Sequence, residues 1–251
     1  MTNTNLSIIF PAYNEAARIR PALLKTVDYL ATWRLPFDFR AEIIVILNGC
    51  TDNTREIVTE TYLEIARKPY HDITLRLDNS RPGKGAAIRR GLNISRGRYI
   101  LVTDVDLSTP LEEMPRLLQS AAANQCIVIG SRRMPGATVK GREGIRAAAA
   151  WVFSYFFTRP LVPGIKDTQC GYKVFTQAAA RKIAPLATLD GFAIDVELLH
   201  IARRLGIGIV EIPVKWTHDK NSTVRVLRDS ARMARDIFII GRNSLTGCYT
   251  E

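Results

Sequence analysis

The sequence lacks a hydrophobic run long enough to cross a membrane. A membrane-spanning helix needs roughly 20 apolar residues, whereas the nearest approach, AAAAWVFSYFFT, covers only residues 147–158, between Arg146 and Arg159. The N-terminal stretch MTNTNLSIIF has neither the basic start nor the apolar core of a secretory signal. We therefore expect no membrane span, and we expect residues 147–158 to form a buried helix or one that lies at a membrane surface.

Cysteine and histidine are also scarce, which argues against a zinc site. The four cysteines form no Cys-x-x-Cys pair, and no histidine lies near them in a ligand spacing. Scattered thiols without a signal peptide are typical of a reducing compartment, so we expect a cytoplasmic protein. Acidic tracts and Gly/Ser tracts are absent, and 251 residues with 47% hydrophobic content are enough for one sizeable core.

Acidic residues are outnumbered, and this imbalance restricts the class of partner. The chain has 35 Lys and Arg against 24 Asp and Glu, a formal net charge of +11. Such an excess can attract nucleic acid, anionic lipid headgroups or phosphorylated small molecules. The sequence contains no RNA-binding aromatic signature, helix-turn-helix or zinc finger. We therefore expect no nucleic-acid partner, which leaves a lipid surface or a phosphorylated substrate.

Short apolar runs alternate with helical patterns in the first half of the chain. Runs rich in Ile and Val predict strands that are buried on both faces, and they cover residues 6–10, 43–47, 99–103 and 126–130. A helical stripe between the first two runs is formed by Ile19, Leu23, Val27 and Leu30. This alternation predicts an α/β fold, with a mostly parallel central sheet flanked by helices.

Further elements are expected later in the chain. Thr109 and Glu112 match a capping box around Pro110, which predicts a helix that starts there. Residues 192–205 are expected to form a helix and residues 207–214 a strand. Residues 224–240 predict an amphipathic helix with arginines on its polar face. That helix either packs on the core with a solvated basic face or faces a membrane.

Ligands of such sheets bind beyond the carboxyl ends of the strands, so the residues that follow each strand carry the functional prediction. Polar groups converge there from four strands. They are Pro11, Tyr13 and Glu15; Asn48 and Asp52; Asp104 and Asp106; and Arg132 and Arg133.

Asp104 and Asp106 are the candidate metal ligands. Residues i and i+2 of an extended segment point the same way, so both carboxylates are expected to face one ligand. Two carboxylates suit Mg²⁺ or Mn²⁺, which keep waters and bind substrate phosphates. An alternative is that Asp106 only caps the turn before Pro110.

Basic residues near these strand ends are candidate phosphate ligands. The forks of Arg132 and Arg133 match phosphate oxygens, although they could also be surface arginines. Lys84 lies between two glycines, a composition found in phosphate-binding loops but without the Walker spacing. Lys84 reaches either a phosphate or water, and Gly85 lets a helix start close to the nucleotide.

Several sequence blocks, in this order, resemble the family 2 inverting glycosyltransferases, and within them the polyprenyl-phosphate group that includes the dolichyl-phosphate glucosyltransferases and mannosyltransferases. The blocks are FPAYNE (10–15), TDVDLSTP (103–110), IGSRRMPG (129–136), DTQCGYKVF (167–175), GFAIDVELL (191–199) and IPVKW (212–216). The resemblance covers nearly the whole chain. It implies a Rossmann-like nucleotide-diphospho-sugar transferase (GT-A) fold in one catalytic domain, residues 1–251, with residues 1–130 mainly binding nucleotide and residues 131–251 mainly binding sugar and acceptor.

The resemblance also implies roles for individual residues. Nucleotide-binding positions are Pro11, Tyr13, Glu15, Asn48, Asp52, Lys84 and Asp104. Asp104 and Asp106 would hold the metal, and the catalytic set is Asp104, Asp106, Asp167 and Asp195. Phosphate or acceptor contacts are expected from Arg132, Arg133, Arg146, Gln169, Ser222 and Arg225. Glu197 lies in the same acidic segment as Asp195, either on the acceptor side or as a surface carboxylate.

Two departures from the family pattern affect these roles. Many members read Asp-Asp-Gly-Ser where this chain reads Leu47-Asn48-Gly49-Cys50, so Asn48 or Asp52 would have to contact the base. Related chains often carry a lysine where Thr223 stands, so a cationic phosphate contact must come from Lys220 or Arg225.

The implied reaction is transfer of a hexose, with inversion, from a nucleotide-sugar to a polyprenyl or dolichyl phosphate at the cytoplasmic face of a membrane. UDP-glucose is the favoured donor and GDP-mannose the second. A lipid acceptor agrees with the basic charge and with the apolar stretch beside Arg142 and Arg146, and it makes an anionic membrane surface an expected partner.

Other functions remain open at this point. A phosphate acceptor is already anionic and needs no strong base, whereas a small hydroxyl acceptor would require Asp167 or Asp195 as the base. The alternatives are a soluble transferase with such a hydroxyl acceptor, a nucleotidyltransferase that releases pyrophosphate, and an inactive nucleotide-binding scaffold.

Overall fold

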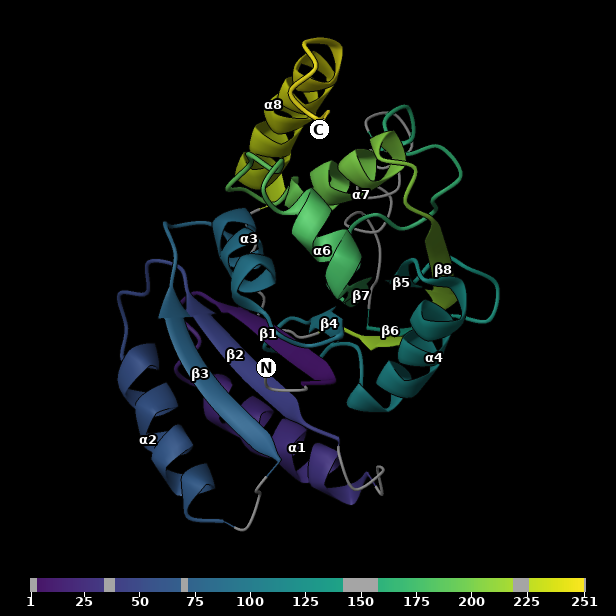
Figure 1. Cartoon of the computed structure of the whole chain (residues 1–251). Helices are drawn as coiled ribbons and strands as arrows, with labels where there is room; N and C mark the ends of the chain where they lie inside the picture. The colour runs from purple at the N-terminus through teal and green to yellow at the C-terminus, as the bar shows by residue number, and fades with distance from the viewer. Residues whose placement is uncertain (1–3, 34–38, 69–71, 142–157, 219–225, 251) are drawn as a thin grey trace.

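The protein is built around a seven-stranded sheet with helices on both faces (Figure 1). The computed structural model describes residues 4–33, 39–68, 72–141, 158–218 and 226–250. The strand order is β3-β2-β1-β4-β7-β5-β8. The strands are β1 (Leu6–Ala12), β2 (Ala41–Leu47), β3 (Ile73–Asn79), β4 (Tyr99–Val102), β5 (Ile127–Ser131), β7 (Lys173–Thr176) and β8 (Ile209–Pro213). All neighbours pair in parallel except β7, which runs antiparallel to β4 and β5.

The four predicted strands are confirmed as β1, β2, β4 and β5. Alternate residues of each strand point to opposite faces of the sheet, and both faces are covered. Ile8 and Phe10 of β1 pack into one core cluster, and Ile9 packs into the other. Because both faces are buried, these strands are mostly apolar rather than alternating between apolar and polar residues.

Two layers of helices enclose the sheet. The helices α1 (Ile19–Thr32), α2 (Thr54–Ala66) and α4 (Met114–Asn124) flank one side, and residues of all three enter the same core cluster. The opposite cluster takes in residues of α3 (Lys84–Ile94), α6 (Gln177–Ile183), α7 (Ile194–Arg204) and α8 (Val226–Leu245). All four apolar residues of the predicted α1 stripe are buried, which confirms that helix. The mostly parallel α/β sheet with flanking helices is confirmed as well.

The predicted capping box at Thr109 is wrong. A short 3₁₀ helix, η1 (Leu111–Glu113), begins there, and it has no side-chain hydrogen bond at its N-terminal cap. Pro110 is extended rather than helical, with φ −61° and ψ 147°, so Thr109 and Glu112 are not placed as the cap and third residue of one helix. The α-helix itself starts at Met114, with a proline in its first positions.

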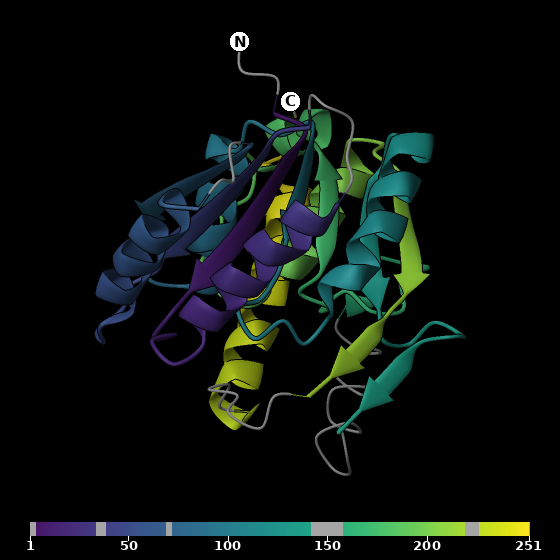
Figure 2. The same ribbon diagram turned by 90° about the horizontal axis from the view of Figure 1, so that it is seen from below.

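The later elements agree with the predictions to within a few residues, apart from the C-terminal end of α8. The helix predicted over residues 192–205 is α7, the strand over 207–214 is β8, and the amphipathic helix over 224–240 is α8, which extends to Leu245. A separate pair of parallel strands, β6 (Thr138–Lys140) and β9 (Lys215–Thr217), lies to one side of the main sheet (Figure 2).

Helix α8 packs on the core through one face. Ile237 and Ile240 are buried, and Ile240 belongs to the core cluster of α3, α6 and α7. The outer face exposes Arg232, Arg235 and Arg242. None of the helices in the described parts of the chain is long and apolar enough to span a bilayer. Residues 147–157 of the predicted apolar stretch lie outside the described residues.

Candidate active site

The carboxyl ends of β1, β2, β4 and β5 bring the predicted polar residues to one edge of the sheet. Pro11 is the penultimate residue of β1 rather than part of the following loop. Tyr13 comes directly after that strand and is 48% exposed, so its ring is available to a ligand. Asn48 follows β2 but is buried, and its backbone N–H donates to Ala12 O at 3.0 Å.

Asp52 ties the first two loops of this edge together. One of its carboxylate oxygens accepts from the N–H of Ala16 at 3.2 Å, and the other accepts from the N–H and hydroxyl of Thr54 at 3.1 and 2.5 Å. Burial tends to raise the pKa of Asp52, but these hydrogen bonds outweigh it and lower the pKa. A contact between Asp52 and a nucleotide base stays a prediction, because the structure shows the carboxylate holding the loops.

Glu15 is a partly buried carboxyl group whose pKa is raised. It accepts from Arg18 Nε at 2.7 Å and from the second nitrogen of the same guanidinium at 3.0 Å. Burial raises the pKa of Glu15 to about 7, Arg18 opposes that rise, and the negative charges of Asp106 and Asp104 add to it. Glu15 therefore belongs to the same electrostatic cluster as the two aspartates.

Asp104 and Asp106 are brought together by a turn. The prediction that they lie on an extended segment is wrong in its geometry, because β4 ends at Val102 and Leu107 N donates to Asp104 O at 3.2 Å. Asp106 accepts from the N–H of Ser108 at 2.9 Å, so it also caps this turn, as the alternative proposed. Burial raises the pKa of Asp106, and the charge of Asp104 raises it further, as expected for neighbouring carboxylates.

Two lysines compensate the acidic charge in a ladder that begins at the partly exposed carboxylate of Asp104. Lys84 Nζ lies 2.8 Å from Asp104 Oδ1 and 4.0 Å from Asp195 Oδ2. Lys173 Nζ lies 2.5 Å from Asp195 Oδ1, and Lys173 is almost fully buried on β7. Burial tends to raise the pKa of Asp104, but Lys84, Lys173 and Arg132 together hold it below its usual value. Opposite charges therefore alternate from Asp104 through Lys84 and Asp195 to Lys173.

Lys173 and Gly171 are site residues that the sequence analysis did not identify. A lysine inside the apolar strand sequence KVFT was the signal that could have found Lys173, because a buried ammonium needs a partner. Gly171 is required for another reason: a Cβ at this position would overlap the carboxylate of Asp104. Both residues lie in the block DTQCGYKVF, so this block helps to hold the carboxylate of Asp104 in place.

Asp167 holds Arg132 in a bidentate ion pair. Arg132 donates from Nε at 2.7 Å and from a terminal nitrogen at 2.8 Å, and its backbone N–H donates to the same carboxylate at 2.9 Å. Asp167 is 1% exposed. Burial tends to raise the pKa of Asp167, but Arg132 outweighs it and holds the pKa far below its usual range. The guanidinium also lies over the ring of Trp216, 5.4 Å from its centroid, so its orientation is fixed from two sides.

The remaining predicted phosphate and acceptor residues fall into two groups. Arg133 donates to Lys166 O at 3.2 Å, and the side-chain nitrogen of Gln169 is buried with no hydrogen-bond partner among the described residues. The other group is Arg146, Ser222 and Arg225, which lie outside the described residues, as do Arg142, Lys220 and Thr223.

Glu197 is not a surface carboxylate. It is fully buried in α7, where its oxygens accept hydrogen bonds from Thr188, Leu189 and Tyr249. The acceptor-side alternative has no support from these contacts.

The donor set fits a hard divalent cation that is completed by a substrate. In the described parts of the chain, no group of three or more His, Cys, Asp and Glu side chains is arranged to hold a metal. Asp104 and Asp106 supply only carboxylate oxygens, the type that Mg²⁺ and Mn²⁺ prefer, and their mutual repulsion would be relieved by a cation. Such ions are commonly held by one or two carboxylates together with substrate phosphates.

Similarity to known proteins identifies the family to which this chain belongs. The family described as Glycosyl transferase family 2 matches residues 7–183, which include all of β1 except Leu6, the aspartate turn, Arg132 and Asp167. The chain belongs to this family. A dolichyl-phosphate beta-glucosyltransferase of Dictyostelium discoideum is 36% identical over 98% of this chain and 77% of its own length. The enzyme of that name from Saccharomyces cerevisiae is 32% identical over 98% of this chain and 77% of its own length.

Solved structures agree with the fold of this family 2 glycosyltransferase. Glucosyl-3-phosphoglycerate synthase from Mycobacterium tuberculosis, in complex with UDP, superposes with a TM-score of 0.66 at 20% identity. The match covers 94% of this chain and 78% of that one. A structure of the same enzyme with Mn²⁺, UDP-glucose and glycerol 3-phosphate has a TM-score of 0.66 at 18% identity and covers 94% of this chain and 79% of that one. At this identity the similarity shows the GT-A fold, as expected from the sequence.

Proposed function

We propose that this glycosyltransferase moves glucose from UDP-glucose to a polyprenyl phosphate, with inversion at the anomeric carbon. The names of the relatives support this acceptor and sugar, because dolichyl-phosphate beta-glucosyltransferases align with nearly the whole chain. UDP-glucose is favoured over GDP-mannose for the same reason. Residues 1–130 would mainly bind the nucleotide, and residues 131–251 would mainly bind the sugar and the acceptor.

The donor's diphosphate would lie against the turn that carries Asp104 and Asp106. Those two carboxylates would hold Mg²⁺ or Mn²⁺, which supplies positive charge for the departing diphosphate. Lys84 and Arg132 add fixed positive charge at the same edge, where preorganised charge contributes most to transition-state stabilisation. Tyr13, exposed after β1, and Asn48 are the candidate contacts for the nucleoside.

The observation that carries the choice of acceptor is the state of the two candidate bases. The carboxylate of Asp167 is bound to Arg132 through three N–H groups, and that of Asp195 is bound to Lys173. The carboxylate of Asp167 is a poor proton acceptor, since Arg132 holds its pKa far below the usual range and protonation would break the ion pair. A phosphate nucleophile is already anionic and needs no base. The geometry therefore supports a phosphate acceptor over a hydroxyl acceptor.

An anionic membrane surface is the proposed second partner, at the cytoplasmic face. The outer face of α8, formed by Arg232, Arg235, Phe238, Arg242 and Leu245, combines exposed arginines with two exposed apolar side chains. Phe238 is 74% and Leu245 91% exposed. A helix with this mixture can lay its apolar side chains among acyl chains while its arginines meet anionic headgroups.

An acceptor panel tests the proposal. The enzyme is incubated with UDP-glucose and Mg²⁺ or Mn²⁺ and one acceptor at a time: a polyprenyl phosphate, the corresponding polyprenol, 3-phosphoglycerate or glycerol. GDP-mannose replaces UDP-glucose in a parallel series. We expect a glucosylated product, detected by mass spectrometry, with the polyprenyl phosphate alone. Equal or faster product formation on glycerol or the polyprenol would instead support a hydroxyl acceptor.

A further inference from the structure

Glu197 of α7 is a buried carboxylate for which the proposed reaction has no use. It is 0% exposed. Its Oε1 accepts from the N–H of Thr188 at 3.0 Å, from the hydroxyl of Thr188 at 2.7 Å and from the hydroxyl of Tyr249 at 2.7 Å. Its Oε2 accepts from the N–H of Leu189 at 2.9 Å. A buried polar group is tolerated when it is fully hydrogen-bonded, so the four donors compensate for the burial of Glu197 but give it no role in the reaction.

The segment that Glu197 holds packs directly against the first turn of α3. The N–H of Gly85 donates to Asp190 O at 2.8 Å, and a Cβ on Gly85 would overlap the carbonyl oxygen of Leu189. Arg89, one turn further along α3, donates to Ala187 O at 2.8 Å and pairs with Asp190. The backbone of residues 187–190 is therefore fixed by Glu197 on one side and in contact with α3 on the other.

The first turn of α3 carries Lys84, whose ammonium lies 2.8 Å from Asp104. We propose that Glu197 is a positioning residue, which sets the Lys84 ammonium at the diphosphate site by fixing the segment of Leu189 and Asp190 against Gly85. The proposal rests on the proposed function in one respect, since Lys84 must contact the diphosphate. A shift of about 1 Å in a group that contacts the reacting atoms can lower a rate roughly 100-fold, so such support matters even at a distance.

The C-terminal end of α8 and the residues after it complete this support. Tyr249 is 1% exposed and donates to Glu197, and Asn243 of α8 donates to the hydroxyls of Tyr249 and Thr188 at 3.3 and 3.4 Å. The segment of residues 187–190 is thus connected to α8 as well as to α7. Tyr249→Phe removes one of the four donors and keeps the ring, which makes it a milder probe than a change of Glu197.

A double-mutant cycle with UDP as the ligand tests the coupling between Glu197 and Lys84. UDP affinity is measured by calorimetry with Mg²⁺ for the wild type, Lys84→Met, Glu197→Gln and the double variant. We expect each single change to weaken UDP binding about 10-fold, and the double variant to bind no more weakly than Lys84→Met, because Glu197 acts through Lys84. Tyr249→Phe should weaken binding less than Glu197→Gln does.

Additive losses, or unchanged UDP affinity in Glu197→Gln, would overturn the proposal. Unchanged affinity in Lys84→Met would instead remove Lys84 from the diphosphate site and refute that part of the proposed function. The two failures are therefore distinguishable.

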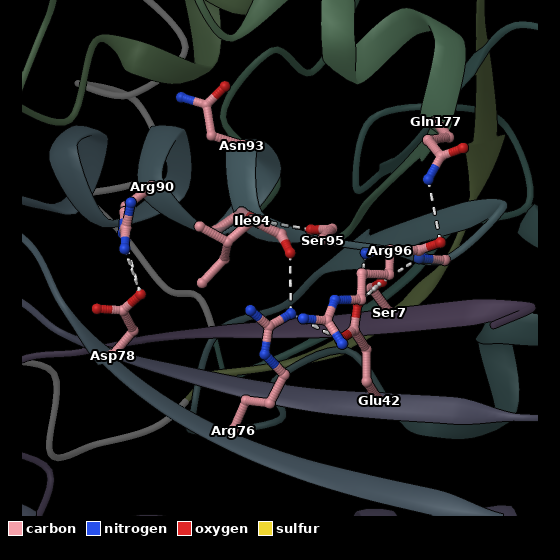
Figure 3. Close-up of polar contacts among 12 residues, drawn as sticks. Ser7, Glu42, Arg76, Asp78, Arg90, Asn93, Ile94, Ser95, Arg96 and Gln177 are labelled. Atoms are coloured by element: carbon pink, nitrogen blue, oxygen red, sulfur yellow. Dashed lines mark hydrogen bonds and ion pairs between the residues drawn. The ribbon is translucent and has the colours of Figure 1, made fainter. Parts of the chain in front are cut away.

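Glu42→Gln is the matched control for loss of stability alone. Glu42 is also a buried carboxylate, and it accepts from the Ser7 hydroxyl and the Arg96 N–H at 2.6 Å and from Arg76 at 2.8 Å (Figure 3). It lies at the amino end of β2, the opposite edge of the sheet from Lys84. We expect Glu42→Gln to lower the melting temperature at least as much as Glu197→Gln, with UDP affinity unchanged. A fall in UDP affinity in Glu42→Gln equal to that in Glu197→Gln would show that general destabilisation is the cause.

Discussion

The carboxylates at this edge of the sheet differ sharply in how readily they take a proton. Arg132 holds the pKa of Asp167 low, whereas burial and like charge raise the pKa of Glu15 and of Asp106. Opposite shifts within one site separate groups that stay charged from groups that take up a proton more readily. Asp167 belongs to the first kind, and the cluster of Glu15 and Asp106 belongs to the second.

Glu15 makes stability depend on pH in a defined window. Its pKa is about 7 in the folded protein against an ordinary value of 4.5, so the folded protein keeps a proton that the unfolded chain has released. The contribution of Glu15 to the free energy of unfolding therefore falls as pH rises from about 4.5 to about 7, and it is constant above that. One pKa unit corresponds to about 1.4 kcal/mol, so the loss is about 3 kcal/mol.

Glu15→Gln removes this titration. Unfolding free energies are measured by urea denaturation, in metal-free buffer, at about pH 4.5 and about pH 8. The unfolding free energy of the wild type should fall by about 3 kcal/mol more than that of the variant between the lower and the higher pH. A difference that does not change with pH would contradict the raised pKa.

Asp167→Asn is expected to damage the protein by leaving Arg132 unpaired. Removing one partner of a buried ion pair typically costs about 3–5 kcal/mol, which thermal or urea unfolding would detect. The rate of glucosyl transfer should fall, because Arg132 loses its fixed orientation, but the shape of the pH–rate profile should persist. Disappearance of an ascending limb from that profile would identify Asp167 as a base after all.

Asp78→Asn serves as the control for that variant. Asp78 pairs with Arg90 at 2.7 Å on the surface (Figure 3). Exposed pairs contribute about 0–1 kcal/mol, so this change should leave stability and rate nearly unaffected.

At the residue scale, the sequence was sufficient to predict the groups that follow strands, but not those that contact them from elsewhere. Asp104, Asp106 and Arg132 were identified because each lies just after a strand of a parallel sheet. Lys173 was missed, because its role depends on β7 entering the sheet antiparallel between β4 and β5. No local pattern states which strand a segment will pair with.

Among the elements, α3 runs from the candidate active site to the opposite edge of the sheet. Its first turn carries Lys84, and its C-terminal end is held by contacts of Arg76 with Ile94 O and of Arg181 with Ser95 O, each at 2.8 Å. The first turn can approach the segment of residues 187–190 only because Gly83 and Gly85 lack side chains. The glycines thus allow close backbone packing, not a phosphate-binding loop of the Walker type.

Gly85→Ala tests that packing. The added methyl group would overlap backbone atoms of Leu189 and Asp190, so the segment must shift. We expect a loss of about 1–3 kcal/mol in unfolding free energy, the usual cost of overpacking, together with weaker UDP binding. Gly241→Ala is the matched control, because nothing lies within 4 Å of a Cβ added at this position in α8. This variant should gain about 0.5–1 kcal/mol in unfolding free energy. Unchanged UDP affinity in Gly85→Ala would contradict the packing argument.

The outer face of α8 is expected to bind anionic lipid. Charge reversal of Arg235 and Arg242 to Glu should abolish sedimentation with vesicles that contain phosphatidylserine, and Phe238→Ala should weaken it. Lys25→Glu, on the exposed side of α1, changes charge elsewhere and should matter much less. Equal loss of sedimentation in Lys25→Glu would mean that net charge, not this face of α8, attracts the vesicles.

Elements with a clear period were predictable, and those set by long-range pairing were not. The stripe of α1 and the apolar strands β1 and β2 follow from local periodicity. The edge strand β3 was not predicted, since it carries Arg76 and Asp78 and is only half-buried. The prediction of a capping box failed because Pro110 takes an extended conformation, which no local pattern had indicated.

On the scale of the whole molecule, one edge of the sheet gathers three aspartates, two lysines and an arginine–aspartate pair, and α8 presents an exposed basic face. These features fit one process, in which a nucleotide-sugar binds at the edge and a lipid phosphate reaches it from a membrane surface. UDP release from UDP-glucose is therefore expected to require both the aspartate turn and a phosphate acceptor.

This requirement is tested by measuring UDP release from UDP-glucose, with Mn²⁺ and with or without a polyprenyl phosphate. The wild type and Asp106→Asn are compared, and both are checked for folding by circular dichroism. We expect rapid release only with the lipid phosphate and metal, reduced about 100-fold or more in Asp106→Asn. Release that is equally fast without the lipid phosphate, or is unaffected by Asp106→Asn, would contradict the account.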